Sequence, residues 1–226
     1  MLKYGLLQAW STPIKRVNLL KNGPVDAKLH RWLEAYADRK ELVSGPLERI
    51  RATRGKYRAA RLQTRYDMAV FSSPKHRELA RIKKVLVAEA DRYVREAILH
   101  PLPRHEKLAY LWFVIQHPHD ATESVRPHFH EPADVAFVYY LSTPTDGSGA
   151  LVLVDPRGTI ERGGRVLPRQ VTSYEFTPQR GDLMIFPRYL MHYTTTNTDS
   201  HDRKVIAGIV AYDLPRETKK RYVVAS

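Results

Sequence analysis

The chain contains no cysteine. Disulfides, thiolate metal sites and a cysteine nucleophile are therefore excluded. Long apolar runs are also missing, since no window approaches the roughly 18 apolar residues that a membrane helix needs. The first residues lack the charged stretch and long apolar core of a signal peptide. We therefore expect a cytoplasmic protein. No GxGxxG or P-loop pattern of a nucleotide-binding protein occurs.

Acidic residues are scarce in the first half of the chain. Residues 1–107 contain 24 Lys and Arg against 11 Asp and Glu, whereas residues 108–226 contain 13 of each kind, so the first half alone carries the formal net charge of +13. A basic surplus of this size favours an anionic partner. The asymmetry limits that expectation to residues 1–107.

Five arginines in the basic half are spaced alternately three and four residues apart. They are Arg51, Arg54, Arg58, Arg61 and Arg65. In a helix this spacing places all five on one stripe, and no Asp or Glu lies between them to offset their mutual repulsion. Such a run is most often a solvated face, and Gly55 disfavours a helix here. The alternative is that Arg54, Arg58 and Arg61 bind nucleic acid or another acidic partner.

The hydrophobic pattern changes from helical to strand-like along the chain. Residues 6–20 predict a short strand and residues 25–42 a helix, and Ser72-Ser73-Pro74 is an N-cap signal for a second helix. The inward positions of that second helix are Leu79, Ile82, Val85, Leu86, Tyr93 and Val94. Short strands are predicted at residues 108–116, 135–141, 150–154, 171–176, 183–186, 191–196, 205–212 and 221–224. This series indicates an antiparallel sandwich or barrel formed by residues 108–226, with residues 1–107 packing on it.

Three histidines in the second half form a candidate metal site. His128 and His130 are two residues apart, so on a strand both point to the same side. If a neighbouring strand brings His192 across, three imidazoles converge and part of the coordination sphere stays open for substrate or oxygen. His117 and His119 have the same spacing, but Pro118 between them indicates a loop near the rim. Each histidine alone could equally be an ordinary surface or core residue.

The order and spacing of several motifs carry more weight than any one histidine. In sequence order they are H-x-H at His128, Tyr139-Tyr140-Leu141, Gly181-Asp182-Leu183, Phe186-Pro187, His192 and Arg203. This set resembles the iron(II)- and 2-oxoglutarate-dependent oxygenases, and is most similar to members whose first motif is H-x-H-P and runs into a Tyr-Tyr strand. The resemblance implies an α+β, mainly β protein with a double-stranded β-helix (jelly-roll, cupin-like) core flanked by N-terminal helices.

The resemblance also implies a set of metal ligands. The family binds iron through H-x-D or H-x-E and a distal histidine, which correspond here to His128, His130 and His192. Because His130 occupies the carboxylate position, three alternatives stay open. His130 is itself the ligand, or Glu131 or Asp134 supplies the carboxylate, or the carboxylate is missing. Side-chain period favours His130, with Asp134 as the main rival.

A co-substrate site follows from the same resemblance. The family's basic residue about ten positions beyond the distal histidine corresponds to Arg203, whose guanidinium suits the outer carboxylate of 2-oxoglutarate. Tyr139 or Tyr140 could add a hydroxyl donor, although packing in the core is the alternative for both. The implied reaction oxidises a small-molecule or peptide substrate through a ferryl species and releases succinate and CO2.

Two other functions remain open from the sequence. A degenerate oxygenase fold could bind nucleic acid or an acidic partner through the arginines of residues 51–65. A cupin-like metal enzyme of another reaction class, such as an isomerase, would not need Arg203. Turnover that depends on both Fe(II) and 2-oxoglutarate would distinguish an active oxygenase from these two alternatives.

Overall fold

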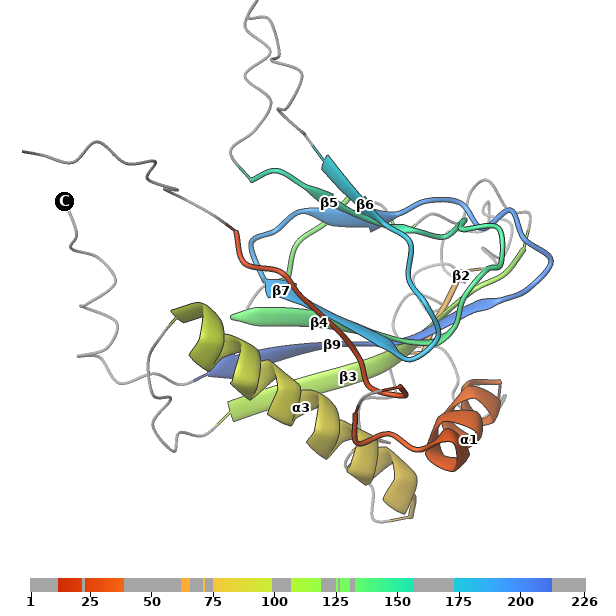
Figure 1. Cartoon of the computed structure of the whole chain (residues 1–226), viewed down its shortest axis with the longest axis horizontal. Coiled ribbons are helices and arrows are strands. Elements are labelled where there is room, and N and C mark those ends of the chain that lie inside the picture. The colour runs from red at the N-terminus through yellow and green to blue at the C-terminus, as the bar shows by residue number, and fades with distance from the viewer. Residues whose placement is uncertain are drawn as a thin grey trace, which may run out of the picture.

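The protein consists of two facing antiparallel sheets with helices against the outer side of the larger one (Figure 1). The computed structural model describes residues 12–21, 23–38, 62–65, 71, 75–98, 107–118, 125, 127–130, 133–156 and 173–212. The helices are α1 (Ala27–Ala37) and α3 (Arg77–Ile98). The strands are β1 (Lys15–Asn18), β2 (Leu62–Arg65), β3 (Lys107–Gln116), β4 (Val135–Ser142), β5 (Leu151–Val154), β6 (Ser173–Phe176), β7 (Asp182–Pro187), β8 (His192–Thr194) and β9 (Arg203–Tyr212).

The larger sheet has the order β1-β7-β4-β9-β3-β2, and the smaller has the order β6-β5-β8. In the larger sheet, β3 and β9 pair over their whole length, from Lys107 opposite Tyr212 to Gln116 opposite Arg203. The predicted mainly β architecture with antiparallel strands is confirmed. Strand β4 is buried on both faces except at its last residue, which explains why its sequence is continuously apolar rather than alternating.

Two apolar layers flank the larger sheet. The inner layer lies between the two sheets and includes Trp112, Tyr140 and Phe186. The outer layer lies between the larger sheet and the helices and includes Leu33, Leu86 and Tyr139. Successive residues of a strand face opposite layers, so each pair of neighbouring residues on β4 contributes to both cores.

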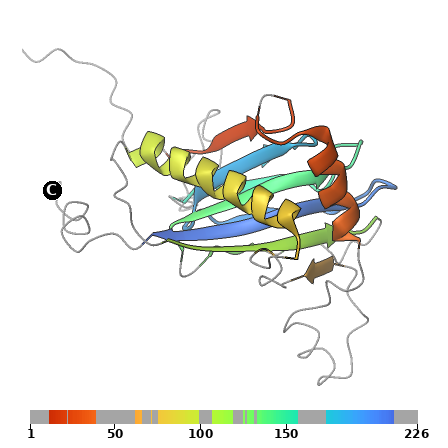
Figure 2. The same cartoon turned by 90° about the horizontal axis from the view of Figure 1, so that it is seen from below.

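The helices cover the outer face of the larger sheet, as Figure 2 shows. Helix α1 begins after Asp26, whose carboxylate accepts a hydrogen bond from Leu29 N at 2.8 Å as an N-cap. Helix α3 buries Leu79, Ile82 and Leu86 against the sheet. The predicted inward face of this helix is confirmed, and its N-cap signal at residues 72–74 lies outside the described residues.

The first strand is part of the same sheet as the C-terminal strands. Strand β1 pairs with β7, and Arg16 forms an ion pair with the buried Asp182 at 2.8 Å. Strand β2 pairs with β3 on the opposite edge. Residues from both sides of position 107 thus form one sheet.

The arginine stripe is only partly visible. Residues 51–61, which include Arg54, Arg58 and Arg61, lie outside the described residues, as does the strand predicted at 221–224. Arg65 lies in β2, so the helix under which all five arginines would share one stripe does not extend to residue 65. Pairing with β3 supplies residues 62–65 with backbone hydrogen bonds, and this tertiary contact overrides the local helical pattern.

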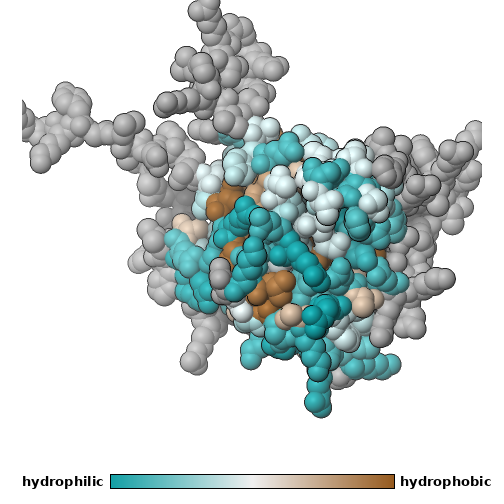
Figure 3. All heavy atoms as spheres, turned by 45° about the vertical axis from the view of Figure 1, so that its right-hand side comes forward, coloured by the Kyte–Doolittle hydropathy of each residue, from teal (hydrophilic) through white to brown (hydrophobic). Residues whose placement is uncertain are grey.

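Neither helix in the described part is long and apolar enough to span a membrane. On the face seen in Figure 3, hydrophilic residues predominate, and hydrophobic ones form small separate patches among the coloured atoms.

Candidate metal centre and co-substrate pocket

His128 and His192 are held together by the backbone. Each donates its N–H to the other's carbonyl at 3.0 Å, which forms an isolated antiparallel bridge beside β8. A turn after β7, in which Leu190 N–H donates to Pro187 C=O at 3.1 Å, returns the chain to this position. The His130 N–H donates to the carbonyl of Arg188 in the same turn at 3.3 Å. Two chain segments about 60 residues apart in sequence thus meet at one point.

The three imidazole rings converge. Their ligand atoms all lie within 4.8 Å of one another. Ring centroids are 4.2 Å apart for His128 and His192, and 5.0 Å apart for each pair that includes His130. No other group of three or more such side chains forms within the described ranges.

The protonation of the rings suits a metal ligand. Leu190 C=O can only accept, so His192 Nδ1, at 2.9 Å, carries the proton and leaves the Nε2 lone pair free. Burial lowers the pKa of His192 to about 3. Burial, followed by the nearby His128, lowers the pKa of His130 to about 4. Both rings are therefore neutral near pH 7, the form that binds metals.

The site lies at the boundary of the inner core. Phe186 meets the His192 ring edge-on at 4.8 Å, and Trp112 meets the His130 ring at 5.9 Å. His192 is buried, whereas His128 and His130 are only half-buried and Phe129 between them is exposed. The cluster therefore has one apolar wall and one side open to solvent.

The rival ligands lie elsewhere or outside the described residues. The Asp134 carboxylate accepts a hydrogen bond from Tyr212 N at 2.8 Å, at the end of β9, and is not part of the cluster. Glu131 and His119 lie outside the described residues. His117 directly follows β3, outside the strand, as the sequence predicts. Its Nδ1 lies 2.9 Å from the carboxylate of Asp202, which directly precedes β9.

Arg203 is a buried cation on the inner face of the larger sheet. Its residue is 2% exposed, and no carboxylate in the described ranges forms an ion pair with it. Its guanidinium carbon lies 5.2 Å from the centre of the Tyr140 ring. Arg203 Nε and the Tyr140 hydroxyl are buried without a hydrogen-bond partner. A buried cation without a counter-ion is costly, so the surroundings of Arg203 are suited to an anion.

Tyr139 and Tyr140 point to opposite faces of the larger sheet. Tyr140 shares the inner face with Arg203, and its pKa is raised by burial, so its hydroxyl stays protonated. Tyr139 faces the helices, where its hydroxyl lies 2.8 Å from His30 Nδ1. The expectation that Tyr139 could reach the co-substrate is therefore corrected. The pleat sends neighbouring side chains to opposite faces.

Sequence reasoning missed Gln116 and Gly149. Gln116 is opposite Arg203 in register and buried; its Nε2 donates to Thr195 C=O at 2.9 Å, and its Oε1 has no partner. A Cβ added at Gly149 would lie within 4 Å of both side chains. A polar residue ending an otherwise apolar strand was the available signal for Gln116. A glycine within a turn-rich segment gave no signal of its role.

Comparison with known proteins finds a similar family. Residues 110–208 match a family model described as "Putative 2OG-Fe(II) oxygenase". A comparison with curated protein sequences gave no match.

Solved structures share the fold at low identity. A prolyl-4-hydroxylase from Pseudomonas putida has a TM-score of 0.52 and 15% identity, covering 89% of this chain and 93% of that one. The α-ketoglutarate-dependent epimerase SnoN from nogalamycin biosynthesis has a TM-score of 0.55 and 14% identity, covering 88% and 78%. A viral collagen prolyl hydroxylase from Paramecium bursaria Chlorella virus-1 has a TM-score of 0.53 and 11% identity, covering 89% and 96%.

These neighbours confirm the jelly-roll core that the motif set implied. The matched residues span β3 to β9 and contain the three histidines and Arg203. Over residues 110–208 the chain is therefore similar to the family described as 2OG-Fe(II) oxygenases.

Proposed function

We propose that this protein is a non-haem iron oxygenase that uses Fe(II) and 2-oxoglutarate. It oxidises a C–H bond of a small-molecule or peptide substrate, by hydroxylation or a related oxidation, and releases succinate and CO2 from 2-oxoglutarate. The observation that carries the proposal is the convergence of the His128, His130 and His192 ligand atoms within 4.8 Å beside the inner core. Bound iron and 2-oxoglutarate supply the oxidising chemistry, and the chain supplies position and surroundings.

His128, His130 and His192 hold the iron. The proton of His192 Nδ1 is fixed on Leu190 C=O at 2.9 Å, and this hydrogen bond orients Nε2 toward the other two rings. Three neutral imidazoles leave the full charge of the metal uncompensated, in contrast to a set with one carboxylate. An anionic co-substrate offsets that charge, so we expect iron and 2-oxoglutarate to bind cooperatively.

Arg203 and Tyr140 hold the outer carboxylate of 2-oxoglutarate. A guanidinium presents paired donors that match a carboxylate, and the neutral Tyr140 hydroxyl can donate a further hydrogen bond. The dicarboxylate supplies the counter-ion that buried Arg203 lacks among the described side chains.

An apolar wall closes one side of the candidate metal site. Trp112 and Phe186 border the histidine cluster, whereas the side with half-buried His128 and His130 is open. We expect substrate to approach from that open side, since the inner core closes the other.

The test is turnover of 2-oxoglutarate by purified protein with and without Fe(II). We expect succinate and CO2 formation that requires the metal and is lost in His192→Ala. His117→Ala is the matched control, because His117 lies on the rim in a pair with Asp202. Metal-dependent turnover that persists in His192→Ala would show that the ligand assignment is wrong. Metal binding without any use of 2-oxoglutarate would favour another class of metal enzyme.

A further inference from the structure

We propose that Gly149 is a positioning residue for Arg203. The missing side chain at Gly149 leaves room for the Arg203 side chain, whose guanidinium lies over the Tyr140 ring, and this sets the affinity for 2-oxoglutarate. The inference rests on the proposed function, in which Arg203 binds the outer carboxylate.

The contact is with the middle of the arginine side chain. A Cβ added at Gly149 would lie 2.8 Å from Arg203 Cδ, and 3.5 Å from Gln116 Oε1 and from Pro144 Cγ. The distance to Cδ is too short for two carbon atoms, so one partner must move. Since Cδ precedes the guanidinium along the side chain, its displacement also moves the donors that bind the carboxylate.

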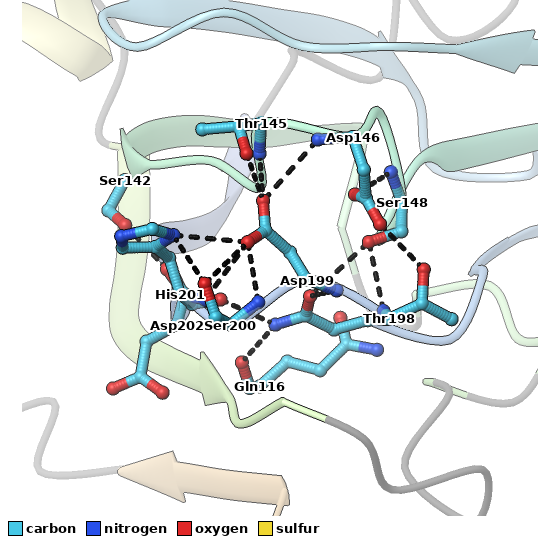
Figure 4. A network of polar contacts seen from close by, with 11 residues as sticks. Gln116, Ser142, Thr145, Asp146, Ser148, Thr198, Asp199, Ser200, His201 and Asp202 are labelled. Atoms are coloured by element: carbon cyan, nitrogen blue, oxygen red, sulfur yellow. Dashed lines mark hydrogen bonds and ion pairs between the residues drawn. The ribbon is translucent and has the colours of Figure 1, made fainter.

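The loop that carries Gly149 is fixed. Gly149 N–H donates to Thr196 C=O at 3.0 Å, and Ala150 N–H donates to Thr195 Oγ1 at 2.8 Å. Earlier in the loop, Thr145 donates through its amide and its hydroxyl to the Asp199 carboxylate. Figure 4 shows Thr145, Asp146 and Ser148 of this loop joined by hydrogen bonds to the segment between β8 and β9. Several hydrogen bonds would have to break before the loop could move away from Arg203.

The backbone of Arg203 is equally constrained. It lies at the start of β9 and pairs with Gln116 on β3, whose Nε2 is itself held by Thr195 C=O. With both backbones fixed, the Arg203 side chain is the part that must give way to a Cβ at Gly149.

The same loop contains a matched control. Gly147 and Gly149 both have positive φ, of 80° and 62°, a region that disfavours other residues. A Cβ at Gly147 would meet only Thr177 Cγ2, at an ordinary 3.5 Å. Gly147→Ala therefore introduces comparable backbone strain without touching Arg203.

The experiment compares wild type, Gly149→Ala, Gly147→Ala and Arg203→Met by anaerobic titration calorimetry, with Fe(II) alone and then with 2-oxoglutarate. We expect Gly149→Ala to weaken 2-oxoglutarate binding about 10- to 100-fold, the scale of one lost hydrogen bond to a charged group. Fe(II) binding should be unchanged, and Gly147→Ala should bind both as wild type does. In uncoupled turnover, Gly149→Ala should raise KM for 2-oxoglutarate with little change in kcat.

The outcomes separate the two proposals. If Arg203→Met binds 2-oxoglutarate like wild type, the assignment of Arg203 under the proposed function fails. If Arg203→Met loses binding but Gly149→Ala behaves like Gly147→Ala, only the role of Gly149 is overturned. Gly149→Asn adds a Cβ with a residue that tolerates positive φ and should repeat the effect of Gly149→Ala. If both Gly149 variants fail to fold while Gly147→Ala folds, Gly149 is purely structural and the inference is wrong.

Discussion

His128 and His192 face each other across a two-hydrogen-bond backbone bridge, with each N–H 3.0 Å from the other's carbonyl. The bridge fixes both main chains before any metal is present. The imidazoles are thus brought together by strand pairing, and a metal does not have to pay for ordering two separate segments.

The ligand set can be tested by comparing His130→Ala with Asp134→Ala. We expect His130→Ala to weaken Fe(II) binding more than about 100-fold, because changes to groups that merely support a ligand already cost 10- to 100-fold. Asp134→Ala should leave the affinity unchanged, since its carboxylate is held by Tyr212 N. Anaerobic metal titration measures both. The reverse pattern would make Asp134 the ligand after a rearrangement of the loop.

A carboxylate at position 130 provides the complementary test. His130→Asp should retain metal binding and reduce the cooperativity between iron and 2-oxoglutarate, because the added negative charge already offsets part of the metal charge. Titration of 2-oxoglutarate with and without Fe(II) measures the cooperativity. Unchanged cooperativity would show that the charge of the ligand set is not what couples the two.

Tyr140→Phe and Tyr139→Phe each remove one hydroxyl group, and the two hydroxyl groups lie on opposite faces of β4. We expect Tyr140→Phe to weaken 2-oxoglutarate binding by about tenfold, the value of one hydrogen bond to a charged group. Tyr139→Phe should leave 2-oxoglutarate binding unchanged and lower stability instead, since it removes the partner of buried His30. Calorimetry and thermal melting of both variants separate the effects. Equal weakening of 2-oxoglutarate binding would contradict the assignment of faces.

Asp199 makes the loop network sensitive to pH. Hydrogen bonds from the Thr145 hydroxyl and amide, then from His201, hold the pKa of Asp199 below its ordinary value. A lowered folded-state pKa means that the stabilisation is full above the unfolded value of about 3.9 and is lost as pH falls through the folded-state value. We expect Asp199→Asn to lower the melting temperature at pH 7, and the difference from wild type to shrink below about pH 4.

Asp38→Asn is the control for that measurement. Asp38 forms an ion pair with Lys204 at 2.8 Å but is 53% exposed, so its loss should have little effect. A melting-temperature difference for Asp199→Asn that stays constant from pH 7 to pH 3 would show that the charge of Asp199 is unimportant.

Gly208 is required by packing on the outer face of the larger sheet. A Cβ at Gly208 would lie 2.4 Å from Phe137 Cζ, on the residue opposite it in register. Gly208→Ala should therefore lower the free energy of unfolding by about 1–3 kcal/mol, the usual cost of overpacking. Adding Phe137→Leu should recover part of this loss in urea unfolding. Strictly additive effects of the two substitutions would exclude the collision as the cause.

The sequence by itself determined the strand series, the apolar face of the long helix and the spacing of His128, His130, His192 and Arg203. These features depend on local periodicity and on the order of residue types, which a single chain displays directly. The predicted strand at residues 108–116 corresponds to β3 almost residue for residue, because a continuous apolar run of that length has few alternatives.

Only the tertiary structure decided which side chains share a pocket. Tyr139 and Tyr140 are adjacent in sequence and equally suited to donate a hydroxyl, and the faces of β4 separate them. Asp134 is a plausible ligand by sequence position, but in the fold its carboxylate accepts a hydrogen bond from Tyr212 N. Arg65 follows a helical spacing, but strand pairing with β3 overrides it. Gly149 acquires its role only through the approach of Arg203, more than 50 residues away. Contacts between distant segments depend on sheet register, and no local pattern encodes that register.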